Sequence, residues 1–209
     1  MKVLAFSGSP IRDGNLEKAI KEILAAVGEP SEFIRLAELQ IRPCLACRKC
    51  VETNRCIQKD DMSVLLDRIR EAPALIIGGF PTFFSLNALT KTFIERLSAL
   101  KHNHMLTRGK LGISVACGFR DAGKVLDYLN SFFDWFQMIR IGSLQVPGCM
   151  PCLTCGFGEK CAYSNVKICY GDDAKINPAM FPSQEQQQQT LKEARRLGEH
   201  LRGKLYELR

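Results

Sequence analysis

The chain has 209 residues, of which 46% are hydrophobic and 24% are charged. This length and composition suit one well-packed globular domain with an appended tail. The N-terminal segment lacks the long apolar region and the cleavage site of a signal peptide, and no stretch is apolar for long enough to span a membrane. The ten cysteines are clustered, which favours metal binding in a reducing cytoplasm over a secreted, disulfide-bonded protein.

The formal net charge of +7 is compatible with a nucleic-acid partner, but it treats every cysteine as neutral and every cofactor as absent. Thiolate ligands and a bound anionic cofactor would offset much of this positive charge. We therefore expect no nucleic-acid partner, and no membrane partner either.

The N-terminal segment contains a predicted strand, a loop and a helix. The strand covers residues 2–7, and apolar residues at helical spacing from Leu16 to Val27 predict a helix that stops at Gly28. The loop between them, SGSPIRDGN, places backbone N–H groups and hydroxyls where the helix begins, an arrangement that stabilises a phosphate monoester. The alternative is a simple turn followed by an N-cap.

A run of cysteines follows the second predicted strand, which covers residues 32–36. Its spacing is C-x2-C-x2-C-x5-C, and its members are Cys44, Cys47, Cys50 and Cys56. Gaps of two residues let a tight loop turn three thiolates toward one point, and the fourth thiolate completes the ligand set of a [4Fe-4S] cluster. Zinc is the main alternative, although its sites usually present two separated pairs, and disulfides or an empty cysteine loop are the third interpretation.

The next segment is predicted to be a helix capped by Asp61 and ending before Pro73, followed by a continuous apolar strand over residues 74–79. Residues 81–85 then lie at the carboxyl end of this strand, where a doubly wound sheet presents its ligand site. Phe83 and Phe84, taken alone, are more typical of a buried core.

The remaining strands and helices complete an alternating pattern. The predicted elements are strands over 110–116 and 138–146, a helix over 125–136 between them, and a final helix over 184–205. This order predicts an α/β fold with a flavodoxin-like, doubly wound, five-stranded parallel sheet and an inserted cysteine-rich cluster loop. We expect the core over residues 1–146 with the cluster loop at 40–60, a second cysteine-rich segment over 147–182, and a C-terminal helix over 183–209 that packs on the core.

The second cysteine run has the same C-x2-C-x2-C-x5-C spacing as the first, at Cys149, Cys152, Cys155 and Cys161. The residues between the cysteines differ between the two runs, so we infer a shared geometry rather than a duplication. A second [4Fe-4S] cluster is the main hypothesis, with zinc, disulfides or unused thiols as alternatives and Cys169 as a possible substitute ligand.

Three motifs occur in order along the chain: the loop GSPIRDGN, the first cysteine run and the segment GFPTFFSLNALTKTFIER. Together they resemble the iron–sulfur flavoproteins of archaea and anaerobic bacteria, which are similar to the NADPH-dependent FMN reductases of the flavodoxin-like superfamily. Ile11 and Leu16 stand where the family's loop has Arg and Thr, and Phe83 stands where the family often has Tyr.

The resemblance implies a bound FMN. It implies that the FMN phosphate lies near Ser7, Ser9, Arg12, Asn15 and Leu16. It also implies that the isoalloxazine ring lies near Pro81, Thr82, Phe83, Phe84, Ser85 and Leu86 on one segment and near Cys117, Gly118, Phe119 and Arg120 on another. Members of this kind form homodimers or homotetramers in which the cluster of one subunit lies near the flavin of a neighbour.

Within the last of these segments, Cys117 by itself is typical of a small buried hydrophobe. Arg120 is a cation that could neutralise a reduced flavin, and the alternative is an ordinary solvated loop arginine. The three histidines are expected at the surface, and no residue is predicted to act as a catalytic acid or base.

The leading functional hypothesis is a cytoplasmic redox protein that carries electrons from a ferredoxin-like donor through [4Fe-4S] to FMN. The final acceptor would be a small molecule or a protein. This hypothesis follows from electron counting, because a cluster passes one electron at a time whereas FMN holds one or two. The alternatives are an NAD(P)H-dependent flavin or quinone reductase, and a zinc-stabilised interaction protein without redox activity.

Overall fold

The computed structural model describes residues 2–208 of the chain and contains one five-stranded parallel sheet. Its strands are β1 (Val3–Ser7), β2 (Ser31–Arg35), β3 (Ala74–Gly79), β6 (Leu111–Gly118) and β7 (Ile139–Pro147). They lie in the order β2-β1-β3-β6-β7, and every neighbouring pair is parallel. The chain thus winds first to one side of β1 and then to the other, which confirms the predicted doubly wound, flavodoxin-like α/β fold.

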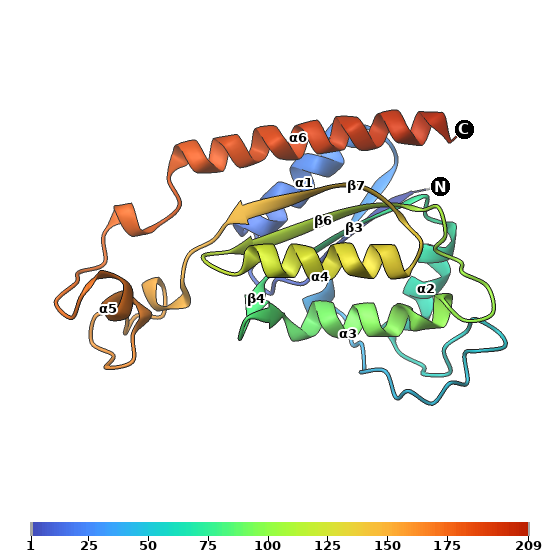
Figure 1. Ribbon diagram of the computed structural model, residues 1–209, viewed down its shortest axis with the longest axis horizontal. Helices are drawn as coiled ribbons and strands as arrows, with labels where there is room; N and C mark the ends of the chain where they lie inside the picture. Colours follow the sequence, from blue (N-terminus) through green and yellow to red (C-terminus); the bar gives the residue numbers. More distant parts are fainter. Residues whose placement is uncertain (1, 209) are drawn as a thin grey trace.

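Helices cover both faces of this sheet (Figure 1). The helices α1 (Asn15–Val27) and α6 (Gln184–Glu207) lie on one face, and the other face carries α2 (Asp61–Glu71), α3 (Ala88–Arg96) and α4 (Ala122–Trp135). Each face has its own apolar cluster, and the sheet separates them. Such burial on both faces explains why the central strands are continuously apolar rather than alternating.

The long helix α6 packs closely against α1 and β7. A Cβ atom at Gly198 would lie only 2.4 Å from the carbonyl oxygen of Ile23 in α1, so the two helix backbones approach each other at this glycine. At the C-terminal end of α1, Gly28 has a φ of 64°, the left-handed conformation with which helices commonly end.

The start of α2 corrects one prediction. The capping residue is Asp60 rather than Asp61, because the two residues Asp60 and Ser63 form a capping box. The Asp60 side chain accepts the Ser63 backbone N–H, and the Ser63 hydroxyl accepts the Asp60 backbone N–H. Asp61 is the first residue of the helix, and its carboxylate instead accepts a hydrogen bond from the backbone N–H of Gln40 at 2.7 Å. Both carboxylates lie near the positive end of the helix dipole.

The two cysteine-rich segments lie at opposite ends of the molecule (Figure 1). The loop after the 3-10 helix η1 (Leu36–Glu38) projects near the C-terminal end of α3, where the second 3-10 helix η2 (Leu97–Leu100) follows. The segment after β7 extends beyond the carboxyl ends of the strands. It contains η3 (Pro151–Leu153), α5 (Asn165–Tyr170) and η4 (Pro178–Met180).

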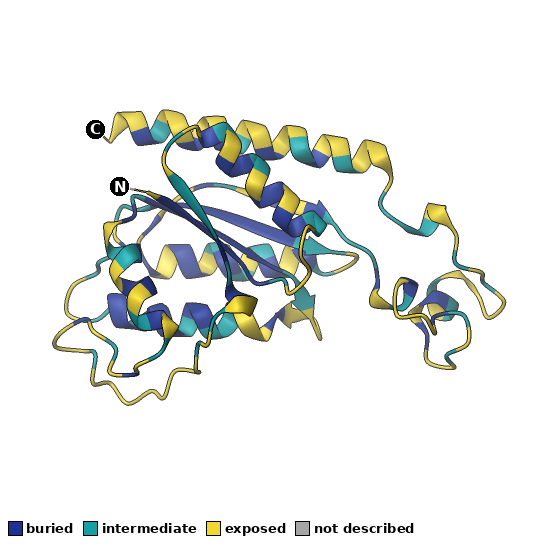
Figure 2. Ribbon diagram, turned by 180° about the vertical axis from the view of Figure 1, so that it is seen from behind, coloured by how far each residue is buried: buried dark blue, intermediate teal, exposed yellow. Residues whose placement is uncertain are grey.

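Most of both cysteine-rich segments is exposed or half-buried, in contrast to the buried strands of the sheet (Figure 2). Among residues 2–208, no helix combines the length and the apolar character needed to cross a membrane.

Candidate functional site

Three loops meet at the carboxyl edge of the sheet: the loop after β1, the hairpin after β3 and the loop after β6. The Asn87 side chain, at the start of α3, joins the first two by donating to the Gly8 carbonyl oxygen at 3.0 Å and accepting from the Phe80 N–H at 3.2 Å. A Cβ atom at Gly8 would lie 1.7 Å from Thr90 Oγ1, so only glycine fits this crossing. At this edge the loop after β1, the hairpin after β3 and the start of α3 are therefore fixed relative to one another by direct contacts.

The loop after β1 is curled by its own serines. The buried Ser7 hydroxyl accepts the Ser9 N–H at 3.3 Å, and the Ser9 hydroxyl accepts the Ile11 N–H at 3.2 Å. The loop ends where α1 begins, and the first N–H groups of a helix have no partner within the helix. These amides and the positive end of the helix dipole make the loop suitable for a phosphate group.

The other three residues predicted near the phosphate have different surroundings. Asn15 donates from its side chain to the Pro147 carbonyl oxygen at 2.9 Å and so ties α1 to the end of β7. The Leu16 side chain is buried in the core, so it does not face a phosphate at the edge. Arg12 is exposed and forms an ion pair with Glu38 at 2.6 Å. Backbone amides and serine hydroxyls are thus better placed for a phosphate than the Arg12 guanidinium is.

Glu17, in the first turn of α1, holds the loop after β1 through a hydrogen bond. Its buried carboxylate accepts the Asp13 N–H at 3.0 Å and forms ion pairs with Arg35 and, at 2.5 Å, with Lys21. Burial alone raises the pKa of Glu17, but the hydrogen bonds from Lys21, Arg35 and the Asp13 amide outweigh it and hold the pKa below its ordinary value.

This lowered pKa predicts a loss of stability in acid. The stabilisation by ionised Glu17 is complete above the unfolded-state pKa of about 4.3 and disappears as the pH falls through the lower folded-state pKa. In urea unfolding followed by circular dichroism from pH 6 to pH 3, Glu17→Gln should lose less stability than the wild type does. The exposed Glu207→Gln is the control and should follow the wild-type curve; equal slopes for all three proteins would contradict the assignment.

The hairpin at the edge consists of β4 (Pro81–Thr82) and β5 (Ser85–Leu86), which pair antiparallel. Phe83 and Phe84 form its turn with φ of 48° and 65°, and they are 92% and 73% exposed, whereas Leu86 is buried. The interpretation of these two phenylalanines as core residues is therefore wrong. Positive φ at both central positions is the conformation of a tight hairpin turn, and here it displays two aromatic rings at the edge.

The loop after β6 lies against this hairpin. A Cβ atom at Gly118 would lie 2.8 Å from the ring of Pro81, so the two segments are in contact. Phe119 is partly exposed, and the Arg120 guanidinium carbon lies 5.4 Å from the centre of its ring. Thus the structure brings together the two segments that the resemblance assigns to the isoalloxazine ring.

Cys117 lies deeper than the rest of this loop. Its thiol donates to the Pro147 carbonyl oxygen at 3.8 Å and packs partly buried against the apolar cluster of the α1 face. Burial, with a smaller contribution from the Cys149 thiol, raises the pKa of Cys117 to about 11. The thiol is therefore protonated near neutral pH and is a poor nucleophile or metal ligand.

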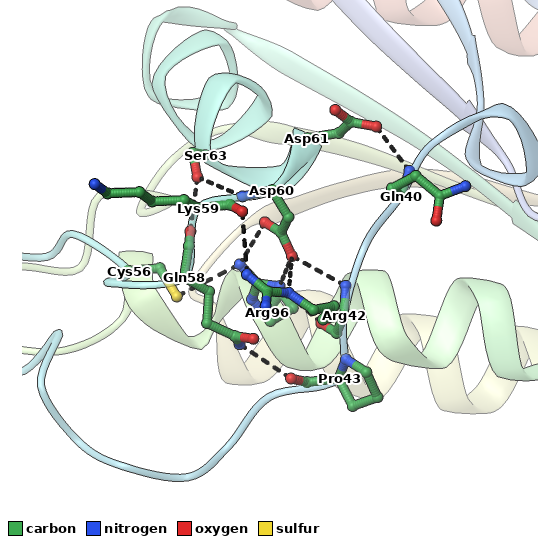
Figure 3. Close-up of polar contacts among 10 residues, drawn as sticks. All are labelled: Gln40, Arg42, Pro43, Cys56, Gln58, Lys59, Asp60, Asp61, Ser63 and Arg96. Atoms are coloured by element: carbon green, nitrogen blue, oxygen red, sulfur yellow. Dashed lines mark hydrogen bonds and ion pairs between the residues drawn. The ribbon is translucent and has the colours of Figure 1, made fainter.

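The first cysteine loop is held at its base by a buried ion pair (Figure 3). Arg96, 1% exposed in α3, contacts both oxygens of the Asp60 carboxylate, at 2.5 and 2.9 Å. Its guanidinium also donates to the Arg42 carbonyl oxygen at 2.7 Å and to the Cys56 sulfur at 3.5 Å. One arginine therefore holds the residues just before and just after the cysteines.

The four thiols of this loop are free and belong to one short stretch of chain. Burial raises the pKa of Cys50, and the neighbouring thiols of Cys56, Cys44 and Cys47 raise it further. Ala46 adopts positive φ between the first two cysteines, which turns the chain sharply. Within residues 2–208, no three cysteine, histidine or acidic side chains converge closely enough to hold a metal ion, so the loop would have to close around one.

The donor set nevertheless fits an iron–sulfur cluster. Four soft thiol ligands in one short loop match its ligand requirement, and the Arg96 guanidinium supplies a hydrogen bond to a ligand sulfur. The buried Nε of Arg96 has no hydrogen-bond partner among the described residues, so one further donor is left at this site.

Sequence reasoning missed Asn87, Thr90 and Arg96. Asn87 precedes a helix directly and is a good N-cap type, which was an available signal. Thr90 and Arg96 show no local signal, because their roles depend on Gly8 and Asp60, which lie far from them in the sequence.

A comparison with known families decides the relationship. Residues 1–149 match the family model described as NADPH-dependent FMN reductase. This chain belongs to that family. Its core is accordingly that of a flavin-dependent oxidoreductase, and the predicted resemblance is confirmed.

Curated relatives agree with this assignment, and a solved structure shares the fold. An iron–sulfur flavoprotein of Methanocaldococcus jannaschii is 34% identical over 148 residues, which cover 68% of this chain and 76% of that protein. An iron–sulfur flavoprotein of Archaeoglobus fulgidus is 30% identical over 148 residues, 68% of this chain and 66% of that protein. An archaeal flavodoxin structure has the same fold, with a TM-score of 0.56, 14% identity and 99% of both chains covered.

The family match ends at Cys149, the first cysteine of the second run. The loop after β1, the first cysteine run and the hairpin all lie inside the matched part, whereas Cys152, Cys155 and Cys161 lie outside it.

Proposed function

We propose that this protein transfers electrons between a ferredoxin-like, low-potential donor and a small-molecule or protein acceptor, using one [4Fe-4S] cluster and FMN. The observation that carries the proposal is the first cysteine loop: it holds four free thiols, and one of them, Cys56, accepts a hydrogen bond from the buried Arg96 guanidinium. When bound, the cluster would supply one-electron steps and FMN would join them to one- or two-electron chemistry.

The residues of the chain bind and orient these groups. Cys44, Cys47, Cys50 and Cys56 would hold the cluster, and Arg96 would donate a hydrogen bond to the Cys56 sulfur, which favours a more reduced cluster. The amides at the start of α1 and the hydroxyls of Ser7 and Ser9 would bind the FMN phosphate. Phe83, Phe84 and the loop from Gly118 to Arg120 would cover the ring and limit its contact with water.

The position of the first cysteine loop supports an oligomer. Asn54, within this loop, donates to the carbonyl oxygens of Ala99 and His104, both beyond the C-terminal end of α3, whereas α3 begins at the carboxyl edge. The nine residues of α3 separate its two ends by about 14 Å. A homodimer or homotetramer in which a second copy presents its carboxyl edge to this loop would shorten the path between cluster and flavin. Ten free thiols also suit a reducing compartment such as the cytoplasm.

The experiment is anaerobic purification with FMN, iron and sulfide counted per chain, followed by stopped-flow reduction. We expect a bound flavin, and we expect Cys47→Ala to lose iron and keep FMN. A reduced ferredoxin should reduce the flavin of the wild type rapidly and that of Cys47→Ala slowly. Protein that stays colourless after anaerobic reconstitution would refute the proposal.

The family assignment favours a second candidate, an NAD(P)H-dependent flavin reductase. The same stopped-flow experiment separates the two, because direct hydride transfer from NADPH to the flavin does not require the cluster. Fast reduction of both wild type and Cys47→Ala by NADPH would favour this second candidate.

A further inference from the structure

The segment after β7 contains few of the features that hold a folded unit together. Its apolar cluster has only three buried members, Met150, Leu153 and Val166, with Cys149 and Cys169 among the partly buried residues packed against them. Units of fewer than about 40 residues usually need disulfides, a metal or association to fold. All five cysteines of the segment are free thiols, so disulfides do not supply this need.

The core of the protein supports the segment at few points. An open groove of about 470 Å³ runs between them, lined on one side by Gly118 and Phe119 and on the other by Tyr170 and Phe181. Two contacts cross near it: the Gly148 N–H donates to the Gly118 carbonyl oxygen at 3.2 Å, and Arg120 donates to the Cys169 sulfur at 3.3 Å. Packing on the core therefore does not replace an internal cross-link.

The cysteine loop of the segment is already turned tightly. Gly156 has a φ of 80°, and a Cβ atom at Gly158 would lie 2.0 Å from the Cys152 carbonyl oxygen, so the chain after Cys155 folds back over Cys152. The Phe157 N–H donates to the Cys155 sulfur at 3.4 Å, and the Phe157 carbonyl oxygen accepts the Cys161 N–H at 2.9 Å. Amide hydrogen bonds to ligand sulfur are a feature of iron–sulfur sites.

From these observations we propose that Cys149, Cys152, Cys155 and Cys161 bind a second iron–sulfur cluster. The segment has no histidine, so its donor set is sulfur, which iron–sulfur clusters and zinc both accept. Three thiols at successive spacings of three residues followed by a fourth favour the cluster, because zinc sites commonly use two separated pairs. Cys169 is not a ligand in this assignment, because Cys161 already supplies the fourth thiol at the same spacing as Cys56 in the first run.

The second cluster differs from the first in its position. Gly148 approaches Gly118 so closely that a Cβ atom would lie 3.0 Å from the Gly118 Cα, which fixes Cys149 at the carboxyl edge beside Cys117. The first cysteine loop lies at the other end of the molecule (Figure 1). The second cluster would thus give each subunit a one-electron centre beside its own flavin; this placement rests on the proposed function, whereas the metal site itself does not.

The test is the iron, sulfide and zinc content of the anaerobically reconstituted full chain. Two clusters give about eight iron and eight sulfide per chain, and Cys152→Ala and Cys47→Ala should each retain about four. Cys169→Ser is the matched control and should retain the wild-type content. Because Cys152→Ala could misfold, its FMN content and its circular dichroism are measured as well, and the wild-type count is decisive without any variant.

Several results would overturn the second cluster. One is a wild type with about four iron atoms that are all lost in Cys47→Ala; that result would leave the proposed function standing. Another is one zinc per chain that is lost in Cys152→Ala. Loss of half the iron in Cys169→Ser but not in Cys161→Ser would overturn the ligand set. Absence of FMN would instead refute the proposed function. The second cluster would still be tested by the iron content of the wild type.

Discussion

Replacement of Arg96 by methionine should destabilise the protein by about 3–5 kcal/mol, because it leaves the buried Asp60 carboxylate without its partner. This is a large share of the roughly 5–15 kcal/mol by which proteins are stable. The same substitution removes the hydrogen bond to the Cys56 sulfur and the support of the Arg42 carbonyl oxygen, so it should also reduce the iron retained by the first loop. Urea unfolding and iron content measure the two effects.

Two further variants separate stability from positioning. Asp60→Asn in the Arg96→Met background removes the unpaired charge and keeps a good capping residue, so it should recover much of the lost stability but not the iron. Arg140→Gln breaks an exposed ion pair with Asp134 and should cost at most about 1 kcal/mol. If Arg96→Met were no worse than Arg140→Gln, the structural role assigned to the buried pair would be wrong.

The sheet and α1 could be predicted because their signals are local. The central strands β1 and β3 are apolar runs between turn residues, and the spacing from Leu16 to Val27 matches a helix with one buried face. The hairpin gave no such signal, since β4 and β5 have two residues each and no period can be read from them. Its turn also uses Phe83 and Phe84 at positive φ, where Gly or Asn is expected.

The residues that would bind the cofactors could be predicted better than the residues that position them. Cysteine spacing and a Ser/Gly loop before a helix are visible in the sequence because the chemistry needs particular residue types close together. Arg96 and Asp60 are 36 residues apart, and a helical arginine is ordinarily exposed, so only the fold reveals that this one is buried. The choice between Asp60 and Asp61 was open to sequence reasoning, because Ser63 completes a capping box only with Asp60.

Replacement of Gly8 by alanine should weaken FMN binding about 10- to 100-fold, because overpacking of about 1–3 kcal/mol falls on the loop predicted to hold the phosphate. The added methyl group would lie 1.7 Å from Thr90 Oγ1, and Thr90 cannot move freely, since its hydroxyl donates to the Asn87 side chain at 2.9 Å. The loop must therefore shift away from α3 and from the start of α1. Fluorescence titration of the flavin-free protein with FMN measures the effect.

A second substitution tests whether the collision is the cause. Thr90→Ala removes the hydroxyl that the added methyl group would meet, so Gly8→Ala with Thr90→Ala should bind FMN more tightly than Gly8→Ala alone. Gly123→Ala lies at the same edge with no atom within 4 Å of its added Cβ, and it should leave FMN affinity unchanged. Equal losses in Gly8→Ala and Gly123→Ala would show that the flavin does not depend on the close approach of the β1 loop to α3. The phosphate site would then have to lie elsewhere on the carboxyl edge.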